Sequence, residues 1–257
     1  MIEAKEELEA LVEKSFNELG IDGKSKESMK SFLKIIELKD NSSSTHEFYP
    51  HSLRTGPFAT IIAMARGYEP RPMLYAGLLH DIGKIAVDNG LLCESDCFDE
   101  QKMEKMKAHV LNGYYILKGI HDFAAEILLW HHYFKPSDPY PTKKEITKLQ
   151  SNLPKHLKQK AKEYGLLLAI ADVYDSLICR NNGRYKRKLV PEETKDEMLR
   201  LFPKNKKIIK ELYNKRILGT DYDGWFGKIK KHGLMGAFKS NSVQHKVSQR
   251  DYDQKHR

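Results

Sequence analysis

Histidine and aspartate residues occur in this chain of 257 residues as short clusters beside apolar residues. They are His51, His80, Asp81, His109, His131, His132 and Asp172. Any one such histidine alone is more often a core or surface residue than a ligand. Buried together without partners they would cost several kcal/mol each, and a shared cation satisfies them all. Mixed histidine and aspartate ligands without cysteine suit Fe, Mn, Co, Ni or Zn better than Ca or Mg.

These residues lie at or near the ends of segments in which apolar residues recur every three or four positions, as in helices. No convincing alternation with a period of two indicates a strand. The sequence therefore predicts an all-α fold, a helical bundle. The segments span 2–19, 26–39, 58–66, 72–82, 101–118, 121–133, 143–150, 155–179, 191–201 and 204–217.

Breaks in this pattern predict three parts. Residues 1–44 would form an N-terminal helical hairpin, a packing surface or the interface of a homodimer. Residues 45–218 would form the domain that carries the metal site. Residues 219–257 would be a basic C-terminal extension, partly flexible, because the polar stretch 239–257 is typical of a loose tail.

The net charge of +9 is concentrated near the C-terminus, where residues 180–257 hold 21 Lys and Arg against 9 Asp and Glu. A basic region can attract a phosphate-bearing ligand, but such stretches are more often solvated faces. We do not expect the chain to bind nucleic acid.

The composition, with 40% hydrophobic and 31% charged residues, is typical of soluble globular proteins. Apolar stretches are far shorter than the roughly 20 residues of a membrane span. The N-terminus is acidic, unlike a secretion signal. We therefore expect a cytoplasmic protein that makes no membrane contact.

The ordered motifs of the chain resemble those of a known enzyme family. They are His80-Asp81-Ile82-Gly83-Lys84, His109 with Gly113, His131-His132, and Ala171-Asp172 through Leu177. This order resembles the HD-GYP subfamily of the HD-domain metal-dependent phosphohydrolases, over residues 45 to 215. The resemblance implies a helical bundle that binds two metals, sometimes three. It also implies a phosphodiesterase that hydrolyses a cyclic dinucleotide such as cyclic di-GMP with a metal-bridging hydroxide.

The resemblance also implies roles for the individual residues. Asp81 would bridge the two ions, for which iron or manganese is expected, and would be catalytic together with Lys84. One ion would be held by His51, His80, Asp81 and Asp172, and the other by His109, His131 and His132. If the helix continues past His80, Lys84 would lie on the same side and neutralise charge on the phosphate.

Two carboxylates near these ligands each allow more than one assignment. Glu47, four residues before His51, would complete a third metal site, but Pro50 disfavours a continuous helix there, and Glu47 is equally well explained as a solvated carboxylate. Asp175 would orient a metal ligand or serve as a cap or surface residue.

The loop after the histidine pair departs from the family pattern. Of the expected Asp-Gly-x-Gly-Tyr-Pro signature only Tyr140-Pro141 remains; Pro139 replaces a glycine, and Tyr133 replaces a glutamate. We expect this loop to set selectivity together with the basic segment from Arg180 to Lys188. The substrate-binding residues would be Lys84, Tyr140, Arg180, Arg184 and Lys186.

Two alternatives remain beside the cyclic dinucleotide phosphodiesterase. The altered loop favours an HD-type phosphohydrolase that acts on another nucleotide or phosphoester. A catalytically silent binding protein is the second alternative, but such a chain would have no physical need to keep the complete ligand set.

Overall fold

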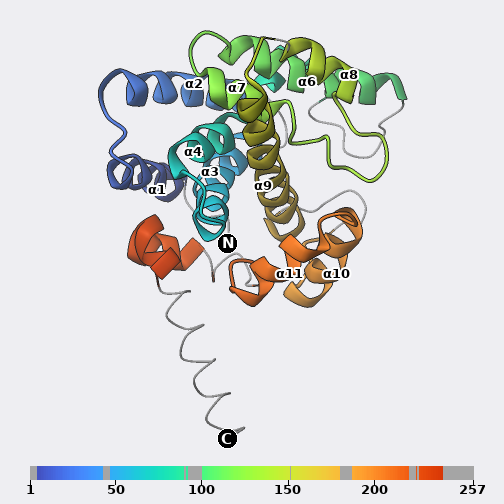
Figure 1. Cartoon of the computed structure of the whole chain (residues 1–257). Helices are drawn as coiled ribbons and strands as arrows, with labels where there is room; N and C mark the ends of the chain where they lie inside the picture. Colours follow the sequence, from blue (N-terminus) through green and yellow to red (C-terminus); the bar gives the residue numbers. More distant parts are fainter. Residues whose placement is uncertain are drawn as a thin grey trace, which may run out of the picture.

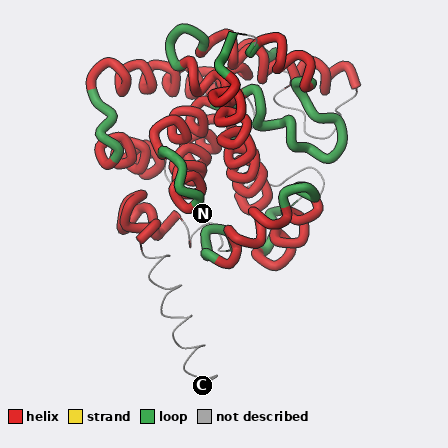
Figure 2. Tube along the Cα trace, in the orientation of Figure 1, coloured by secondary structure: helices red, strands yellow, loops and turns green. Residues whose placement is uncertain are grey.

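The computed structural model describes residues 5–42, 47–89, 91, 100–150, 152–179, 187–219, 224 and 226–239. Within these ranges the chain forms helices joined by turns and loops and has no β-strand, as Figure 2 shows. The predicted all-α fold is confirmed. Among the described helices, none is both long enough and apolar enough to span a bilayer.

The helices follow one another with short connections, and Figure 1 gives their arrangement. Residues 226–239 are also helical. In chain order the named elements are α1 (Lys5–Glu18), α2 (Gly23–Asn41), α3 (Phe48–Ala65), α4 (Pro70–Leu79), the 3-10 helix η1 (Ile82–Ala86), α6 (Glu100–Leu117), α7 (Asp122–Leu128), α8 (Lys143–Leu149), α9 (Lys155–Cys179), α10 (Pro191–Leu201) and α11 (Lys206–Asn214).

Helix α3 lies at the centre of the bundle and packs against α4 and α9 (Figure 1). Of its 18 residues 16 are buried, so it has no polar face turned to solvent. A helix that is buried on all sides belongs to the core of a domain. The polar residues of α3, among them His51, Arg54 and Thr55, are therefore held inside the protein.

The start of α3 differs from the predicted segment 58–66, because the helix already begins at Phe48. Pro50 stands in its first turn, where the missing N–H has no partner within the helix. The buried polar residues between Phe48 and Pro57 hid this half of the helix from an analysis of apolar spacing. The earlier start brings His51 into the rigid core.

The end of α7 also differs from the predicted segment 121–133, because this helix ends at Leu128. The chain then turns, with the N–H of Trp130 donating to Ile127 and that of His131 donating to Leu128. The His131 ring binds the same Leu128 carbonyl, at 2.6 Å, and helps to satisfy the helix end. Both histidines of the pair therefore lie in a turn.

The N-terminal helices and the segment 226–239 share one continuous core with the central helices. Leu8 and Phe16 of α1 and Met29 of α2 are buried in it, and so are Phe226 and Leu234. Part of the predicted C-terminal extension is thus a packed helix, whereas residues 240–257 lie outside the described ranges. The boundaries at 44 and 218 stay predictions.

The 3-10 helix η1 meets α6 backbone to backbone at Gly83. A Cβ placed on Gly83 would lie 1.8 Å from the carbonyl oxygen of His109 and 2.5 Å from the backbone nitrogen of Gly113. No side chain fits in that space, so glycine is required for this close approach. The contact sets His109 of α6 beside Asp81, which directly precedes η1.

Replacing Gly83 with alanine should therefore separate η1 from α6. Overpacking at a site with such short contacts costs about 3 kcal/mol of unfolding free energy. Gly227→Ala is the matched control, because a Cβ there meets nothing within 4 Å. Chemical unfolding followed by circular dichroism measures both variants. A Gly83→Ala protein as stable as the Gly227→Ala control would contradict the packing argument.

Candidate metal centre

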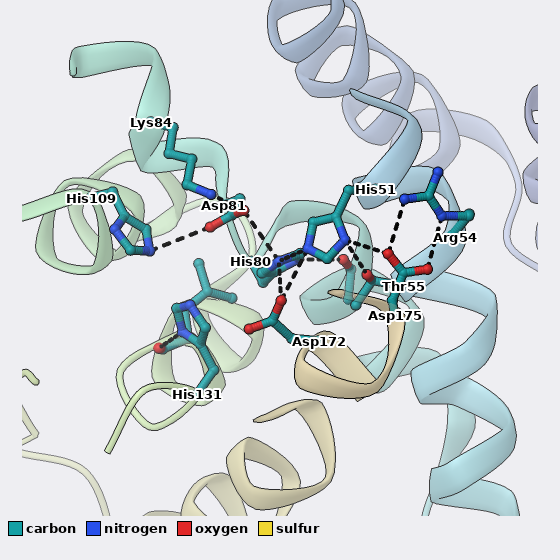
Figure 3. A network of polar contacts seen from close by, with 12 residues as sticks. His51, Arg54, Thr55, His80, Asp81, Lys84, His109, His131, Asp172 and Asp175 are labelled. Carbon is teal, nitrogen blue, oxygen red and sulfur yellow. Dashed lines mark hydrogen bonds and ion pairs between the residues drawn. The ribbon is translucent and has the colours of Figure 1, made fainter. Parts of the chain in front are cut away.

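The predicted ligands converge from five parts of the fold, as Figure 3 shows for six of them. His51 comes from α3, and His80 and Asp81 lie in the bend between α4 and η1. His109 comes from α6 and Asp172 from α9, while His131 and His132 lie in the turn after α7. Helices far apart in the sequence thus bring all seven predicted residues to one place.

The ligand atoms form two groups that meet at Asp81. In one group Asp81, His109, His131 and His132 offer ligand atoms within 4.8 Å of one another. In the other group His51, His80 and Asp81 do the same. The Asp81 side chain, 2% exposed, is the member common to both groups.

Asp172 extends the second group. Its Oδ1 lies 3.0 Å from Nε2 of His51 and 3.7 Å from Nε2 of His80. The two Nε2 atoms of His51 and His80 are themselves 3.1 Å apart. Two imidazole nitrogens and a carboxylate oxygen therefore point at one small volume.

Backbone carbonyls fix the orientation of three of the histidine rings. The Nδ1–H of His80 donates to Gly77 at 2.9 Å, that of His109 to Met106 at 2.6 Å, and that of His131 to Leu128 at 2.6 Å. In the neutral ring with its proton on Nδ1, the Nε2 carries a free electron pair. This tautomer is the one that ligates a metal through Nε2.

Two of these Nε2 atoms are buried without a hydrogen-bond partner. They belong to His109 and His131, and neither makes a hydrogen bond among the described residues. The Asp81 Oδ1 lies 3.3 Å from the His109 Nε2, but with the ring proton on Nδ1 both of these atoms are acceptors. Buried polar atoms in native proteins nearly always have a partner, and leaving one unpaired is costly. A divalent cation would accept both electron pairs, so the residues present fit a metal centre.

The ring of His51 is oriented by a carboxylate. Its Nδ1 lies 2.7 Å from Oδ2 of Asp175, which is fully buried. The same carboxylate accepts from Nε of Arg54 at 2.8 Å and from Nη2 at 3.0 Å. Asp175 thus has the geometry of a residue that orients a metal ligand, which was one of its predicted roles. Arg54, for which no role was predicted, holds the Asp175 carboxylate in place (Figure 3).

Burial keeps most of these imidazoles neutral. It lowers the pKa of His109 to about 4 and that of His131 to about 3, and it also holds the pKa of His132 well below its ordinary value. Neutral rings are the form that binds metal. Burial would lower the pKa of His80 too, but the carboxylates of Asp81 and Asp172 outweigh it and the pKa is raised.

The carboxylates at the centre stay ionised. Burial would raise the pKa of Asp81, yet Lys84 and His80 hold it well below its usual range. His51 and His80 likewise keep the pKa of Asp172 low against the effect of burial. The site therefore offers anionic oxygens beside neutral imidazoles, the donor set of a transition-metal site.

Lys84 does not lie on a continuation of α4, as the sequence prediction assumed. Helix α4 ends at Leu79, His80 caps it, and Lys84 lies in η1. Its ammonium pairs with Oδ2 of Asp81 and lies 5.5 Å from the centre of the Phe48 ring. The lysine is on the same side as the ligands, as expected, because the 3-10 helix places residues three apart on one face.

Other predicted site residues lie at the edge of the centre or outside the described ranges. Glu47 directly precedes α3, with Oε2 3.7 Å from Nη2 of Arg54, and it belongs to neither ligand group. Its role in a third metal site stays a prediction. Arg180, Arg184 and Lys186 are among the residues that the structure does not describe.

A pocket of about 340 Å³ opens over the ligands Asp81, His109 and His132. Tyr140, a predicted substrate residue, lines it with its ring 4.6 Å from that of His132. Lys135 also lines it; it belongs to the loop that was expected to set selectivity, but no individual role was predicted for it. Nothing in the spacing distinguished Lys135, because only the folded loop turns it toward the ligands.

Comparison with known proteins gives a family and two named relatives. The sequence matches the HD domain family over residues 48–177. It is 28% identical over 141 residues to a cyclic di-GMP phosphodiesterase of Thermotoga maritima, covering 52% of this chain and 35% of the relative. It is 27% identical over 173 residues to the cyclic di-GMP phosphodiesterase response regulator RpfG of Xanthomonas campestris pv. campestris, covering 64% and 40%.

The chain thus spans less than half the length of these curated relatives. Among solved structures, the HD domain of the phosphodiesterase PgpH from L. monocytogenes aligns with 17% identity and a TM-score of 0.45. That alignment covers 83% of this chain and 99% of the other.

Removing one imidazole should lower the metal content of the protein by one ion per chain. His131→Ala takes a ligand from the group of Asp81, His109, His131 and His132, whereas the group around His51 keeps its set. The control is His156→Ala, an exposed histidine on α9. Elemental analysis after anaerobic loading with Mn²⁺ gives the count. Equal metal content in both variants would mean that His131 is not a ligand.

Proposed function

Because this chain belongs to the HD domain family, we propose that it is a metal-dependent phosphohydrolase that cleaves a phosphodiester bond. One observation carries the proposal: two groups of histidine and aspartate side chains, all buried except the half-buried His132, meet at Asp81. A carboxylate shared in this way is suited to bridge two cations. Two-metal sites brace the attacking and leaving oxygens of an in-line displacement at phosphorus.

The ligands would divide between two cations in the same way as the two groups do. His51, His80 and Asp172 would hold one ion, and His109, His131 and His132 the other, with Asp81 between them. When bound, two divalent ions offset the charge of phosphoryl oxygens and lower the pKa of water toward neutrality. Iron or manganese is our proposal for both ions, and Glu47 would complete a site for a third.

The remaining side chains position the reactants. Lys84, whose ammonium already pairs with Asp81, lies where it can meet a phosphate oxygen as negative charge develops. Arg54 and Asp175 hold the His51 ring in one orientation. Tyr140 stands over His132 at the pocket and limits the direction from which a substrate enters.

Cyclic di-GMP, as a representative cyclic dinucleotide, is the proposed substrate. Both curated relatives bear the name of a cyclic di-GMP phosphodiesterase, which supports this choice. Phosphodiester chemistry does not depend on the bases, so the contacts beyond the metal centre decide selectivity.

Another nucleotide or phosphoester is the second candidate, and the loop from Tyr133 to Pro141 favours it. The Tyr133 ring packs against Trp130 at 4.9 Å between ring centres and lines neither pocket beside the loop. Tyr133 stands in place of the family's glutamate, and a tyrosine has no carboxylate to offer a substrate.

Asp81→Asn tests the proposed activity, because it keeps the shape of the side chain and removes the charge shared by both ions. Two-metal catalysis supplies several kcal/mol, and 1.4 kcal/mol equals a factor of ten, so hydrolysis should fall roughly 1,000-fold. Bis(p-nitrophenyl) phosphate and cyclic di-GMP are the substrates. The control is Asp196→Asn, an exposed position on α10. Activity of Asp81→Asn within tenfold of this control would refute the proposal.

A further inference from the structure

The pocket over the metal ligands has two walls that come from different parts of the chain. Met106 and His109 line it from α6, whereas Lys135 and Tyr140 line it from the loop after the histidine pair, residues 133–141. Among the described residues, no backbone hydrogen bond joins this loop to α6. The spacing of the two walls therefore depends on contacts between side chains.

An ion pair connects the two walls. Nζ of Lys107 on α6 lies 2.6 Å from Oδ2 of Asp138 in the loop. The Lys107 side chain is 15% exposed and also pairs with Glu104, so two carboxylates hold its ammonium in one place. The same Nζ is 5.9 Å from the centre of the Tyr140 ring. The ion pair thus lies beside the aromatic residue that packs over His132.

The backbone of the loop has little freedom at Asp138. Its φ of +53° lies in the left-handed region, which aspartate and asparagine tolerate better than other residues with a side chain. Pro139 follows directly, and its ring restricts the conformation of the residue before it. The Asp138 carboxylate is therefore presented to Lys107 by a backbone that few other conformations can replace.

Tyr140 lies between this ion pair and the start of α8. On the α8 side a capping box fixes the chain: the N–H of Thr142 donates to Oε2 of Glu145 at 2.8 Å, and the N–H of Glu145 donates to Oγ1 of Thr142 at 3.3 Å. On the other side the Asp138 carboxylate ties the loop to α6. The ion pair therefore restricts how far the middle of the loop, and with it Tyr140, can lie from α6.

We propose that Lys107 is a positioning residue, which holds the loop against α6 through its ion pair with Asp138 and so keeps the Tyr140 ring over His132. Tyr140 then forms a fixed wall of the pocket, and the substrate meets a pocket of constant width. The effect on catalysis rests on the proposed function, because it assumes that the substrate binds beside Tyr140.

The variants break the ion pair and keep the shape of the loop. Lys107→Met keeps the length of the side chain and removes its charge. Asp138→Asn removes the charge and keeps a residue that tolerates the left-handed backbone. Lys107→Arg keeps the cation, and the matched control is Lys105→Met, an exposed lysine on the same helix that does not line the pocket.

Digestion with proteinase K measures how the loop is held, with neither metal nor substrate present. Mass spectrometry locates cleavage within residues 133–141, and its rate follows the population in which the loop is open. Exposed ion pairs are worth a factor of roughly two to five, and Asp138 is 66% exposed. Lys107→Met and Asp138→Asn should be cleaved faster by that factor, and Lys107→Arg and Lys105→Met at the native rate.

Kinetics of the manganese-loaded protein with bis(p-nitrophenyl) phosphate measure the positioning. KM should rise roughly two- to fivefold in Lys107→Met and in Asp138→Asn, and no further in the double variant, because both changes remove the same contact. The value of kcat should stay within about twofold, since no metal ligand changes. Lys107→Arg should keep the native KM.

Two results would overturn the proposal. If Lys107→Met is cleaved no faster than Lys105→Met, the ion pair does not hold the loop. If the loop is cleaved faster but KM is unchanged, Lys107 has no positioning role. A native protein that hydrolyses no diester would instead refute the proposed function, and with it the effect on KM, whereas the proteolysis would still decide whether the ion pair holds the loop.

Discussion

The buried carboxylate of Asp81 is the constraint on which the rest of the structure depends. A charge that is 2% exposed must be compensated, and Lys84, His80 and His109 all face it. Helix α4 ends before Asp81, which lets this residue lie between two groups of ligands. Gly83 then allows η1 to touch α6 and brings His109 to the same carboxylate. Each of these local features serves to surround one anionic group.

Without a bound cation, burying these polar side chains lowers the stability of the folded protein. The buried Nε2 atoms of His109 and His131 make no hydrogen bond among the described residues, and burial lowers the pKa of both rings and keeps them neutral. The surrounding apolar core offsets this cost, with α3 buried on nearly all sides and α9 packed along it. A site that is unfavourable by itself and rigidly supported is preorganised for a ligand that supplies the missing interactions.

Residue type and local period were enough to predict the fold class. The candidate ligands were predicted from the ordered motifs that resemble the HD family, and their role as ligands stays a prediction. His51, His80, Asp81, His109, the histidine pair and Asp172 were predicted together, and the fold brings them together. The predicted start of α3 was wrong because the first half of this helix contains buried polar residues, which apolar spacing does not reveal. The predicted end of α7 was wrong because the chain turns after Leu128, where the His131 side chain binds the end of the helix. Arg54 and Lys135 acquire their positions only through tertiary contacts.

Crystals of the protein loaded with Mn²⁺, measured at the manganese absorption edge, test the two-metal arrangement most directly. Two anomalous peaks should lie on opposite sides of the Asp81 carboxylate, about 3.5 to 4 Å apart. One peak should be bound by His51, His80 and Asp172, and the other by His109, His131 and His132. A single peak, or peaks that do not have Asp81 between them, would contradict the account.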